Sequence, residues 1–329
     1  MSEVLTCDME TALLYETALG RAYLGDSLAI MRDLPDESVN LIVTSPPFPL
    51  TFQKKKPYAA IRIDQYVEWL VECAKHFKRL LVEDGSFVLD IGGVWNKGTP
   101  TRSLYQYHLL IALCERLGFH FAQDFYWYNP GALPAPAEWV NVRRIRVKCA
   151  VNLVWWLTKS PWPKANNRNV LKSYSQDMLR LIKHGYRSKE RPSGHNITPK
   201  FRKNLGGAIP SNLLELGNND SNGAYLKSCE AAGLPVHPAR FPRGLPDFFI
   251  RLCTDRSDLV LDPFAGSNVT GEAAENLDRH WIAIEFSKEY LEGSKFRFQL
   301  PSAALPKKVK RSTACPPERS EGSLQLFSP

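Results

Sequence analysis

The 329-residue sequence has no run of about 18 consecutive apolar residues, the length that a membrane-spanning helix needs. Its first residues include Glu3, Asp8 and Glu10 and no long apolar stretch, which is not the pattern of a secretory signal peptide. The seven cysteines are scattered and odd in number, so neither a metal site of paired cysteines nor a complete set of disulfides is expected. We therefore expect a soluble protein of the reducing cytoplasm, without metal or membrane.

Apolar residues are plentiful, and positive charge is in excess. Hydrophobic residues make up 44% of the chain, enough for a large core, and Lys and Arg outnumber Asp and Glu by 42 to 34. The excess is local, because residues 159–208 hold 12 basic residues and only two acids, Asp177 and Glu190. This balance favours a polyanionic partner, although a solvated, loop-rich cap is the alternative.

The segment Thr44-Ser45-Pro46-Pro47-Phe48 directly follows an apolar run that predicts a buried parallel strand, whose carboxyl end is where open α/β sheets carry their chemistry. Successive prolines cannot donate backbone hydrogen bonds, so nearby carbonyls are left to accept from a ligand. A serine hydroxyl and a flat phenylalanine face complete a site that suits an exocyclic amine on an aromatic base. The alternative is a proline-rich turn with a core phenylalanine. The candidate catalytic residues here are Ser45, Pro46, Pro47 and Phe48.

A second motif, at 262–268, follows the apolar run 259–261 and precedes a helical pattern. A strand, a tight turn and a helix place backbone amides around a polar ligand. The next strand-like run ends in Glu285, 19 residues after Gly266, which is about the spacing of a ribose-binding acid in dinucleotide-type folds. An accidental strand, turn and helix is the alternative. The candidate cofactor residues are Asp262, Pro263, Phe264, Ala265, Gly266, Ser267, Asn268 and Glu285.

Together, Ser-Pro-Pro-Phe at 45–48 and Asp-Pro-Phe-Ala-Gly-Ser at 262–267 resemble the motifs of the S-adenosylmethionine-dependent DNA amino-methyltransferases, with the catalytic motif first. The resemblance covers residues 24–291. In that family a serine at the first catalytic position marks the cytosine-N4 enzymes, whereas aspartate or asparagine is usual in adenine-N6 enzymes. Asn268 stands where relatives commonly have glycine; because asparagine tolerates positive φ, we expect the turn to be kept. Further matching segments are Asp124–Trp127, Glu138–Asn141, Arg191–His195 and His237–Pro242.

The resemblance implies a doubly wound, Rossmann-like α/β sheet of seven strands, the last antiparallel, with the two motifs on neighbouring central strands. It divides the chain into a catalytic half (1–158), an inserted target-recognition region (159–236) and a cofactor-binding half (237–300). Residues 301–329, rich in Pro, Ser, Lys and Glu, are predicted to be a disordered tail.

The resemblance also implies S-adenosyl-L-methionine as cofactor and double-stranded DNA as partner. A flipped cytosine would be held by Ser45 and the Pro46 carbonyl for in-line attack on the methyl group, without metal or covalent intermediate. None of the cysteines follows a proline, so the thiol adduct of the cytosine-C5 enzymes is not expected. Similarity across the recognition region suggests the target CAGCTG. The resemblance also implies a role in a restriction-modification system, and whether a cognate restriction endonuclease acts on the same site is left open by the sequence.

Several other residues carry open alternatives. Asp26 lies near the cofactor's adenine by resemblance, and it also suits a helix N-cap. Asp90, at the polar end of the strand-like run 85–93, either orients Ser45 or receives charge from the substrate, or it caps a loop. The basic insertion 130–148, between strand-like runs, suits a DNA-facing arm, and residues 1–20 suggest one helix.

Three other functions stay open. An adenine-N6 methyltransferase would have the same motifs and basic segment, with a different residue in place of Ser45. A nucleotide-dependent oxidoreductase would explain the cofactor turn but neither the Ser-Pro-Pro-Phe segment nor the basic segment. A non-catalytic DNA-binding module would have no use for a cofactor turn followed by an acid at ribose spacing.

Overall fold

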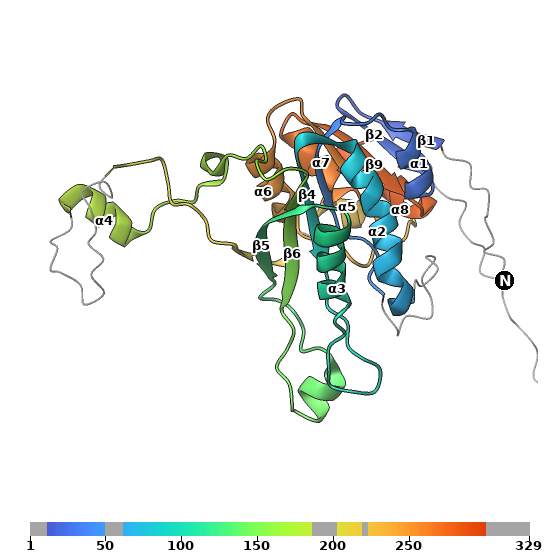
Figure 1. The fold of residues 1–329 in the computed structure, drawn as a ribbon, viewed down its shortest axis with the longest axis horizontal. Coiled ribbons are helices and arrows are strands. Elements are labelled where there is room, and N and C mark those ends of the chain that lie inside the picture. The colour runs from blue at the N-terminus through green and yellow to red at the C-terminus, as the bar shows by residue number, and fades with distance from the viewer. Residues whose placement is uncertain (1–11, 50–61, 186–202, 219–222, 301–329) are drawn as a thin grey trace, which may run out of the picture.

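The computed structural model describes residues 12–49, 62–185, 203–218 and 223–300. Its centre is a mixed sheet, in which nine strands lie within these ranges (Figure 1). The predicted tail, 301–329, falls outside them. In spatial order the strands are β1 (Ala12–Glu16), β2 (Gly20–Leu24), β9 (His280–Glu285), β8 (Leu259–Asp262), β3 (Val39–Thr44), β4 (Leu81–Ile91), β6 (Val151–Thr158), β5 (His120–Tyr128) and β7 (Leu213–Glu215).

The middle of the sheet has the predicted doubly wound topology. Strands β2, β9, β8, β3 and β4 are parallel, and β6 runs antiparallel between β4 and β5. These seven strands correspond to the expected seven-stranded sheet, with β6, the last strand of the catalytic half, reversed. The motif strands β3 and β8 are neighbours, as predicted. Two short strands, β1 and β7, extend the two edges and were not expected.

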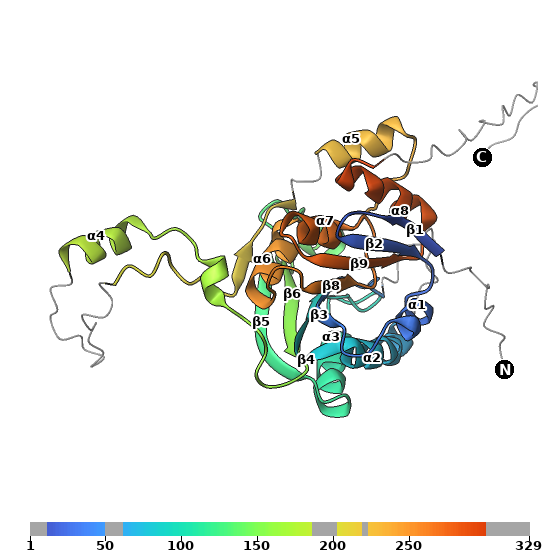
Figure 2. The same ribbon diagram turned by 90° about the horizontal axis from the view of Figure 1, so that it is seen from above.

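Helices cover both faces of the sheet (Figure 2). One face carries α1 (Ser27–Asp33), α2 (Ile63–Leu80) and α3 (Tyr105–Ile111), which continues as a π-helical turn, Ala112–Arg116. The other face carries α6 (Gly244–Cys253), α7 (Val269–Asn276) and α8 (Lys288–Ser294), followed by the 3-10 turn Lys295–Phe298. Helix α5 (Ala224–Ala231) packs on α8 and this 3-10 turn, outside the layer that covers the sheet (Figure 2). The sequence pattern of residues 241–253 predicts an amphipathic helix that leads to the cofactor strand, and the structure forms it as α6, which begins at Gly244.

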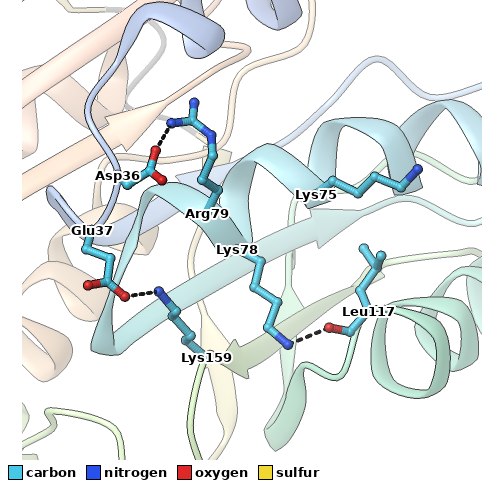
Figure 3. A pocket seen from close by; sticks show the side chains of 7 residues that line it. All are labelled: Asp36, Glu37, Lys75, Lys78, Arg79, Leu117 and Lys159. Carbon is cyan, nitrogen blue, oxygen red and sulfur yellow. Dashed lines mark hydrogen bonds and ion pairs between the residues drawn. The ribbon is translucent and has the colours of Figure 1, made fainter.

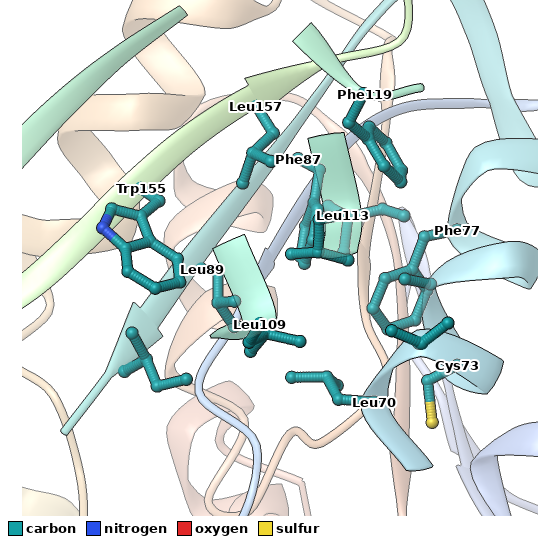
Figure 4. Close-up of a cluster of buried hydrophobic side chains, with 14 of the residues drawn as sticks. Leu70, Cys73, Phe77, Phe87, Leu89, Leu109, Leu113, Phe119, Trp155 and Leu157 are labelled. Atoms are coloured by element: carbon teal, nitrogen blue, oxygen red, sulfur yellow. The ribbon is translucent and has the colours of Figure 1, made fainter. Parts of the chain in front are cut away.

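The larger core lies between α2, α3 and the sheet (Figure 4). Leu70, Cys73 and Phe77 of α2 recur at helical spacing and are fully buried. They pack toward Phe87 and Leu89, which point to the same face of β4. This packing fixes β4, the strand that ends beside the catalytic segment.

The N-terminal segment is not the single helix suggested by the sequence, because residues 12–16 form β1, antiparallel to β2. Ala, Leu and Glu favour helices locally, but the free edge of β2 offers backbone partners and a buried site for Tyr15. Tyr15 packs against Trp281 and Phe298, with ring centroids 6.2 and 5.9 Å away. Tertiary packing therefore overrides the local preference.

Two segments extend from the sheet in different directions (Figure 1). Residues 129–150, between β5 and β6, form an extension that contains the π-helical turn Glu138–Val142. Residues 159–212 contain the 3-10 turn Asn167–Val170 and α4 (Gln176–His184), which lies far from the sheet and has no buried residue. Residues 186–202 of this segment lie outside the described ranges.

Candidate active site

The end of β3 is tied to both neighbouring strands. Thr44, its last residue, is fully buried and donates its hydroxyl to Oδ1 of Asp262 on β8, at 2.7 Å. Ser45, the next residue, donates to Oδ2 of Asp90 on β4, at 3.0 Å. Because successive side chains of extended backbone point to opposite sides, two adjacent hydroxyls can reach in two directions. The start of the Ser-Pro-Pro-Phe segment is thus held from both sides.

Asp90 is a buried carboxyl beside the serine hydroxyl. Burial raises its pKa to about 7, and hydrogen bonds from Ser45 and Asn152 oppose this rise. Its second oxygen, Oδ1, has no hydrogen-bond partner among the described residues. The sequence left three roles open for Asp90, which are to orient Ser45, to receive charge from the substrate or to cap a loop, and in the structure Asp90 accepts from Ser45. A carboxyl with a pKa near neutrality can hold a hydroxyl and receive a proton.

Phe48 lies directly over Gly92, the first residue after β4. A Cβ added to Gly92 would lie 2.6 Å from Cε2 of Phe48, so only glycine leaves room for the ring. The backbone beneath is fixed, because Tyr105 donates its hydroxyl to the Gly92 carbonyl and Gln106 donates to the Ile91 carbonyl at 2.8 Å. Pro46 is buried, whereas Ser45, Pro47 and Phe48 are half-buried.

Asp262 holds the cofactor turn together rather than standing open to a ligand. Its Oδ1 accepts from Thr44 and from the Phe264 backbone N–H at 3.1 Å, and its Oδ2 accepts from the Thr270 hydroxyl at 2.6 Å. Burial raises its pKa to about 6, and the bonds from Thr270 and Thr44 oppose the rise. Asp262 therefore joins β3, β8 and α7, and its contribution to a cofactor site runs through the backbone that it positions.

The turn after β8 approaches the end of β9. Gly266 has φ 54 and donates its N–H to Oε2 of Glu285 at 2.8 Å. Oε1 of Glu285 accepts from the Ser287 N–H, also at 2.8 Å. The sequence predicted Gly266 and Glu285 for one site, and the structure brings them into direct contact. A Cβ at Gly266 would lie 3.1 Å from the His237 ring, so the turn is closely covered on that side.

The other turn residues are each held by a different element. The Pro263 carbonyl accepts from the Ser27 hydroxyl of α1 at 2.5 Å. The Ala265 N–H donates to the Ile284 carbonyl at 2.9 Å, and the Phe264 ring lies 5.4 Å from that of Trp69 on α2. Arg297 donates to the Ser267 hydroxyl at 3.1 Å. Asn268 has φ 54 and ψ 47, so the prediction that it accepts a left-handed conformation is confirmed.

Asp26 is the N-cap of α1 and accepts from the Ala29 N–H at 3.2 Å. It is exposed, and the Gly25 N–H before it donates to the Glu285 carbonyl at 3.1 Å. The capping alternative is therefore observed, and the position remains close to the end of β9.

Candidate residues thus lie at the carboxyl ends of five neighbouring parallel strands, β2, β9, β8, β3 and β4. In that order the residues are Asp26, Glu285, Asp262, Ser45 and Asp90. Parallel strands end at one edge, which is where open α/β sheets bind their ligands. Three features of this edge fit a nucleoside cofactor. They are an acid in contact with a backbone turn, an aromatic ring, and a glycine with little free space above it.

Four contributing residues were missed by sequence reasoning: Tyr15, Trp69, Thr270 and Arg297. They come from β1, α2, α7 and the last 3-10 turn and meet the motifs only in the folded chain. A buried threonine in the first turn of α7 was the available signal, since a hydroxyl in an apolar helix face needs a partner. The other three have no distinguishing local pattern.

A cavity of about 570 Å³ lies at the opposite edge of the sheet (Figure 3). Its cations are occupied by protein groups: Arg79 donates to the Leu34 carbonyl at 2.9 Å, Lys78 to the Leu117 carbonyl at 2.5 Å, and Lys159 to Glu37 at 2.9 Å. These groups close the carboxyl end of α2, and the cavity is separate from the motif edge.

The basic residues of the segment 159–208 include two groups, those paired with acids near the sheet and those on exposed α4. Lys159 pairs with Glu37, and Lys164 pairs with Asp258 at 2.7 Å, so both hold the segment against the sheet. In contrast, the side chain of Arg180 on α4 is 77% exposed. In the extension 129–150, the basic residues are Arg143, Arg144, Arg146 and Lys148.

Comparison with known proteins identifies the family. A model of the DNA methylase family matches residues 39–296, which is most of the chain. The chain belongs to the DNA methylase family. It is 50% identical over 287 residues to the type II methyltransferase M.PvuII of Proteus hauseri, covering 86% of this chain and 85% of that protein. It is also 25% identical over 276 residues to the type II methyltransferase M.BglII of Bacillus subtilis, covering 83% and 67%.

Solved structures with the same fold agree with this assignment. One, titled PvuII DNA methyltransferase (cytosine-N4-specific), superposes with a TM-score of 0.71 at 42% identity and covers 90% of both chains. A complex of M1.HpyAVI with SAM shares the fold, with a TM-score of 0.52 at 22% identity, covering 86% of this chain and all of that one. The recognition made from the two sequence motifs is thereby confirmed.

Two features are absent from the described part of the chain. No helix there is long and apolar enough to cross a membrane. No group of three or more His, Cys, Asp or Glu side chains in the same ranges is placed to bind a metal ion.

Proposed function

We propose that this DNA methylase transfers a methyl group from S-adenosyl-L-methionine to the exocyclic N4 amine of a flipped cytosine in double-stranded DNA. One observation carries the proposal. The Ser45–Asp90 hydrogen bond and the Gly266–Glu285 hydrogen bond lie at the same edge of the sheet, at the ends of the neighbouring strands β9, β8, β3 and β4. The serine in the catalytic motif and the cytosine-N4-specific relative support cytosine over adenine. We further propose that the enzyme protects a restriction site, CAGCTG.

Each side chain has a separate task in this scheme. S-adenosylmethionine, when bound, supplies a methyl group already activated for transfer by its positive sulfur. Glu285 and the turn at Gly266 bind its nucleoside part, while Phe48 stacks on the cytosine ring. Ser45 and the Pro46 carbonyl accept hydrogen bonds from the amine, which orients its nitrogen lone pair. The amine loses one proton as the new N–C bond forms, and the Ser45–Asp90 pair is placed to receive it.

The DNA would lie along the catalytic edge. The extension 129–150 connects the carboxyl end of β5 to the start of antiparallel β6, so it leaves the sheet at the same edge as Ser45. Its basic residues Arg143 and Arg144 suit phosphate contacts, although Arg143 also pairs with Glu138 at 2.7 Å. The region 159–236 would read the sequence, with exposed α4 as its projecting element.

The product of the reaction tests the function. Duplex DNA is incubated with the purified protein and S-adenosylmethionine, digested to nucleosides and analysed by mass spectrometry against standards. We expect N4-methylcytosine, separable from the C5 isomer by retention, and its loss when CAGCTG is altered. N6-methyladenine would instead support the adenine alternative, and methylation at another sequence would contradict the proposed target alone.

A variant of the catalytic serine, compared with a surface variant, tests whether Ser45 acts in the chemical step. Ser45→Ala should lower the single-turnover methyl transfer rate by about a hundredfold or more, the usual range for a proton-transfer group, with DNA binding nearly intact. Arg116→Ala, which removes an exposed ion pair with Glu68 far from the motifs, is the matched surface control and should leave the rate unchanged. An unchanged rate in Ser45→Ala would remove the serine from the mechanism.

A further inference from the structure

The cofactor turn is also held by an element outside both motifs, the N-terminal strand β1. Asn268 is fully buried and is the N-cap of α7, where its Oδ1 accepts from the Gly271 N–H at 3.0 Å. A Cβ at Gly271 would lie 2.3 Å from that oxygen, so glycine leaves the space that the capping amide occupies. The other side of the amide, Nδ2, donates to the Tyr15 hydroxyl at 3.0 Å.

The directions of these hydrogen bonds are determined. The Ser294 hydroxyl donates its only proton to the Leu291 carbonyl at 2.7 Å. The hydroxyls of Tyr15 and Ser294 are 2.6 Å apart, so the proton between them belongs to Tyr15. The Tyr15 oxygen is left to accept from Asn268. Reversing the Asn268 amide would set its oxygen against a hydroxyl whose proton is already donated, so the chain fixes the amide in its capping orientation.

The chain of bonds is buried throughout. Tyr15 is 8% exposed, and Ser294 and Asn268 are fully buried. Burial raises the pKa of Tyr15 to about 12, so its hydroxyl keeps its proton at working pH. Polar networks of this kind are rigid when every member is satisfied and costly when one is removed.

We propose that Tyr15 is a positioning residue of the cofactor site: through Asn268 it holds the backbone of residues 266–268 in the shape that binds S-adenosylmethionine. Glycine at this position would adopt positive φ without help, whereas asparagine does so at a cost that an anchor must offset. Tyr15, Asn268 and Gly271 therefore form a set in this chain. The inference rests on the proposed function, because it concerns affinity for that cofactor.

The test is a double-mutant cycle with Tyr15→Phe and Asn268→Gly. The dissociation constant of S-adenosylmethionine is measured by calorimetry on the full chain without DNA, and KM and kcat are measured with DNA. Tyr15→Phe should raise the dissociation constant and KM about fivefold, as expected for one lost buried hydrogen bond, and leave kcat unchanged. In the Asn268→Gly background the same change should alter affinity by less than about twofold, because glycine needs no anchor.

Thr17→Val is the matched control. Its hydroxyl also joins the N-terminal hairpin to α7, by donating to Glu275 at 2.6 Å, but it does so away from the cap. It should lower the melting temperature and leave cofactor affinity unchanged. Equal effects of Tyr15→Phe in both backgrounds, or equal loss of affinity in Thr17→Val, would overturn the positioning role. Failure of the unmodified chain to bind S-adenosylmethionine would overturn the proposed function itself, and the inference with it.

Discussion

At the scale of residues, two buried aspartates flank the end of β3 and differ in what they accept. Asp262 receives two hydroxyls and a backbone N–H, whereas Asp90 receives the Ser45 hydroxyl and the Asn152 side chain and keeps Oδ1 without a partner among the described residues. Burial raises the pKa of each, to about 6 for Asp262 and about 7 for Asp90. One is suited to hold structure, and the other to take part in proton transfer.

The role of Asp90 predicts a pH dependence. The carboxylate form of Asp90, which can take up a proton through Ser45, predominates only above its pKa of about 7. The single-turnover rate should therefore rise as pH increases through about 7, and Asp90→Asn should lower the plateau and remove this rise. Rapid-quench measurements from pH 5.5 to 8.5 test it, with DNA binding measured at each pH to exclude a change in affinity. The same rise in Asp90→Asn would assign the titration to another group.

The same shift makes a prediction about stability. Because the folded pKa of Asp90 lies above the unfolded value of about 4, the folded state binds the extra proton between about pH 4 and 7. Its contribution to stability is present at low pH and is lost as pH rises through this window. Asp90→Asn should flatten that part of the pH profile of the free energy of unfolding, measured with urea. An Asn variant with an unchanged profile would contradict the buried position.

Asp262 should act mainly on the fold. Asp262→Ala leaves the buried hydroxyls of Thr44 and Thr270 without their acceptor, so we expect a loss of about 2 to 4 kcal/mol in the free energy of unfolding. Cofactor affinity should fall with it, since the turn loses its support. Urea unfolding and calorimetry measure both, and Asp33→Ala, at an exposed site on α1, is the control. A stable variant with weakened binding would instead indicate direct contact with the ligand.

At the scale of elements, helices and strands were predictable where a local sequence pattern determines them. The apolar runs before Ser45 and Asp262 are strands, and the amphipathic patterns of residues 104–117 and 241–253 form α3 with its π-helical turn and α6. The strands β1 and β7 were missed, because five and three residues at a sheet edge carry no clear periodicity. The Thr44–Asp262 bond, between residues 218 apart in sequence, depends on strand order and has no local signal.

The segment after β3 makes its own prediction, because its serine and phenylalanine contact different things. The Ser45 hydroxyl donates to Asp90, whereas the apolar ring of Phe48 lies over Gly92 and can interact with a base only by stacking. Phe48→Ala should weaken base capture by about 1 to 3 kcal/mol, a typical stacking contribution. A mismatch at the target cytosine lowers the cost of extrusion, so it should restore activity in part to Phe48→Ala but not to Ser45→Ala. Equal rescue of both would contradict this division.

At the scale of the whole molecule, charge and topology combine. Net positive charge was visible in the composition, but only the folded chain shows which cations are used internally. Lys159 and Lys164 are paired with acids of the main sheet domain, whereas Lys183 and Arg180 lie on exposed α4. A count of basic residues in the sequence therefore overstates the number that can meet a phosphate.

This separation gives a salt-dependence prediction with an internal control. The slope of log K against log salt for DNA binding should be near −0.9 for each phosphate contact. Lys183→Ala should make the slope shallower by about one unit if the α4 region lies on DNA, because one counterion fewer is released. Lys164→Ala removes the same charge from a site already neutralised by Asp258, so it should leave the slope unchanged. Equal changes of the slope in both variants would mean that only net charge matters. A slope near zero for the unmodified chain would mean that the basic segment is solvated surface that does not contact DNA.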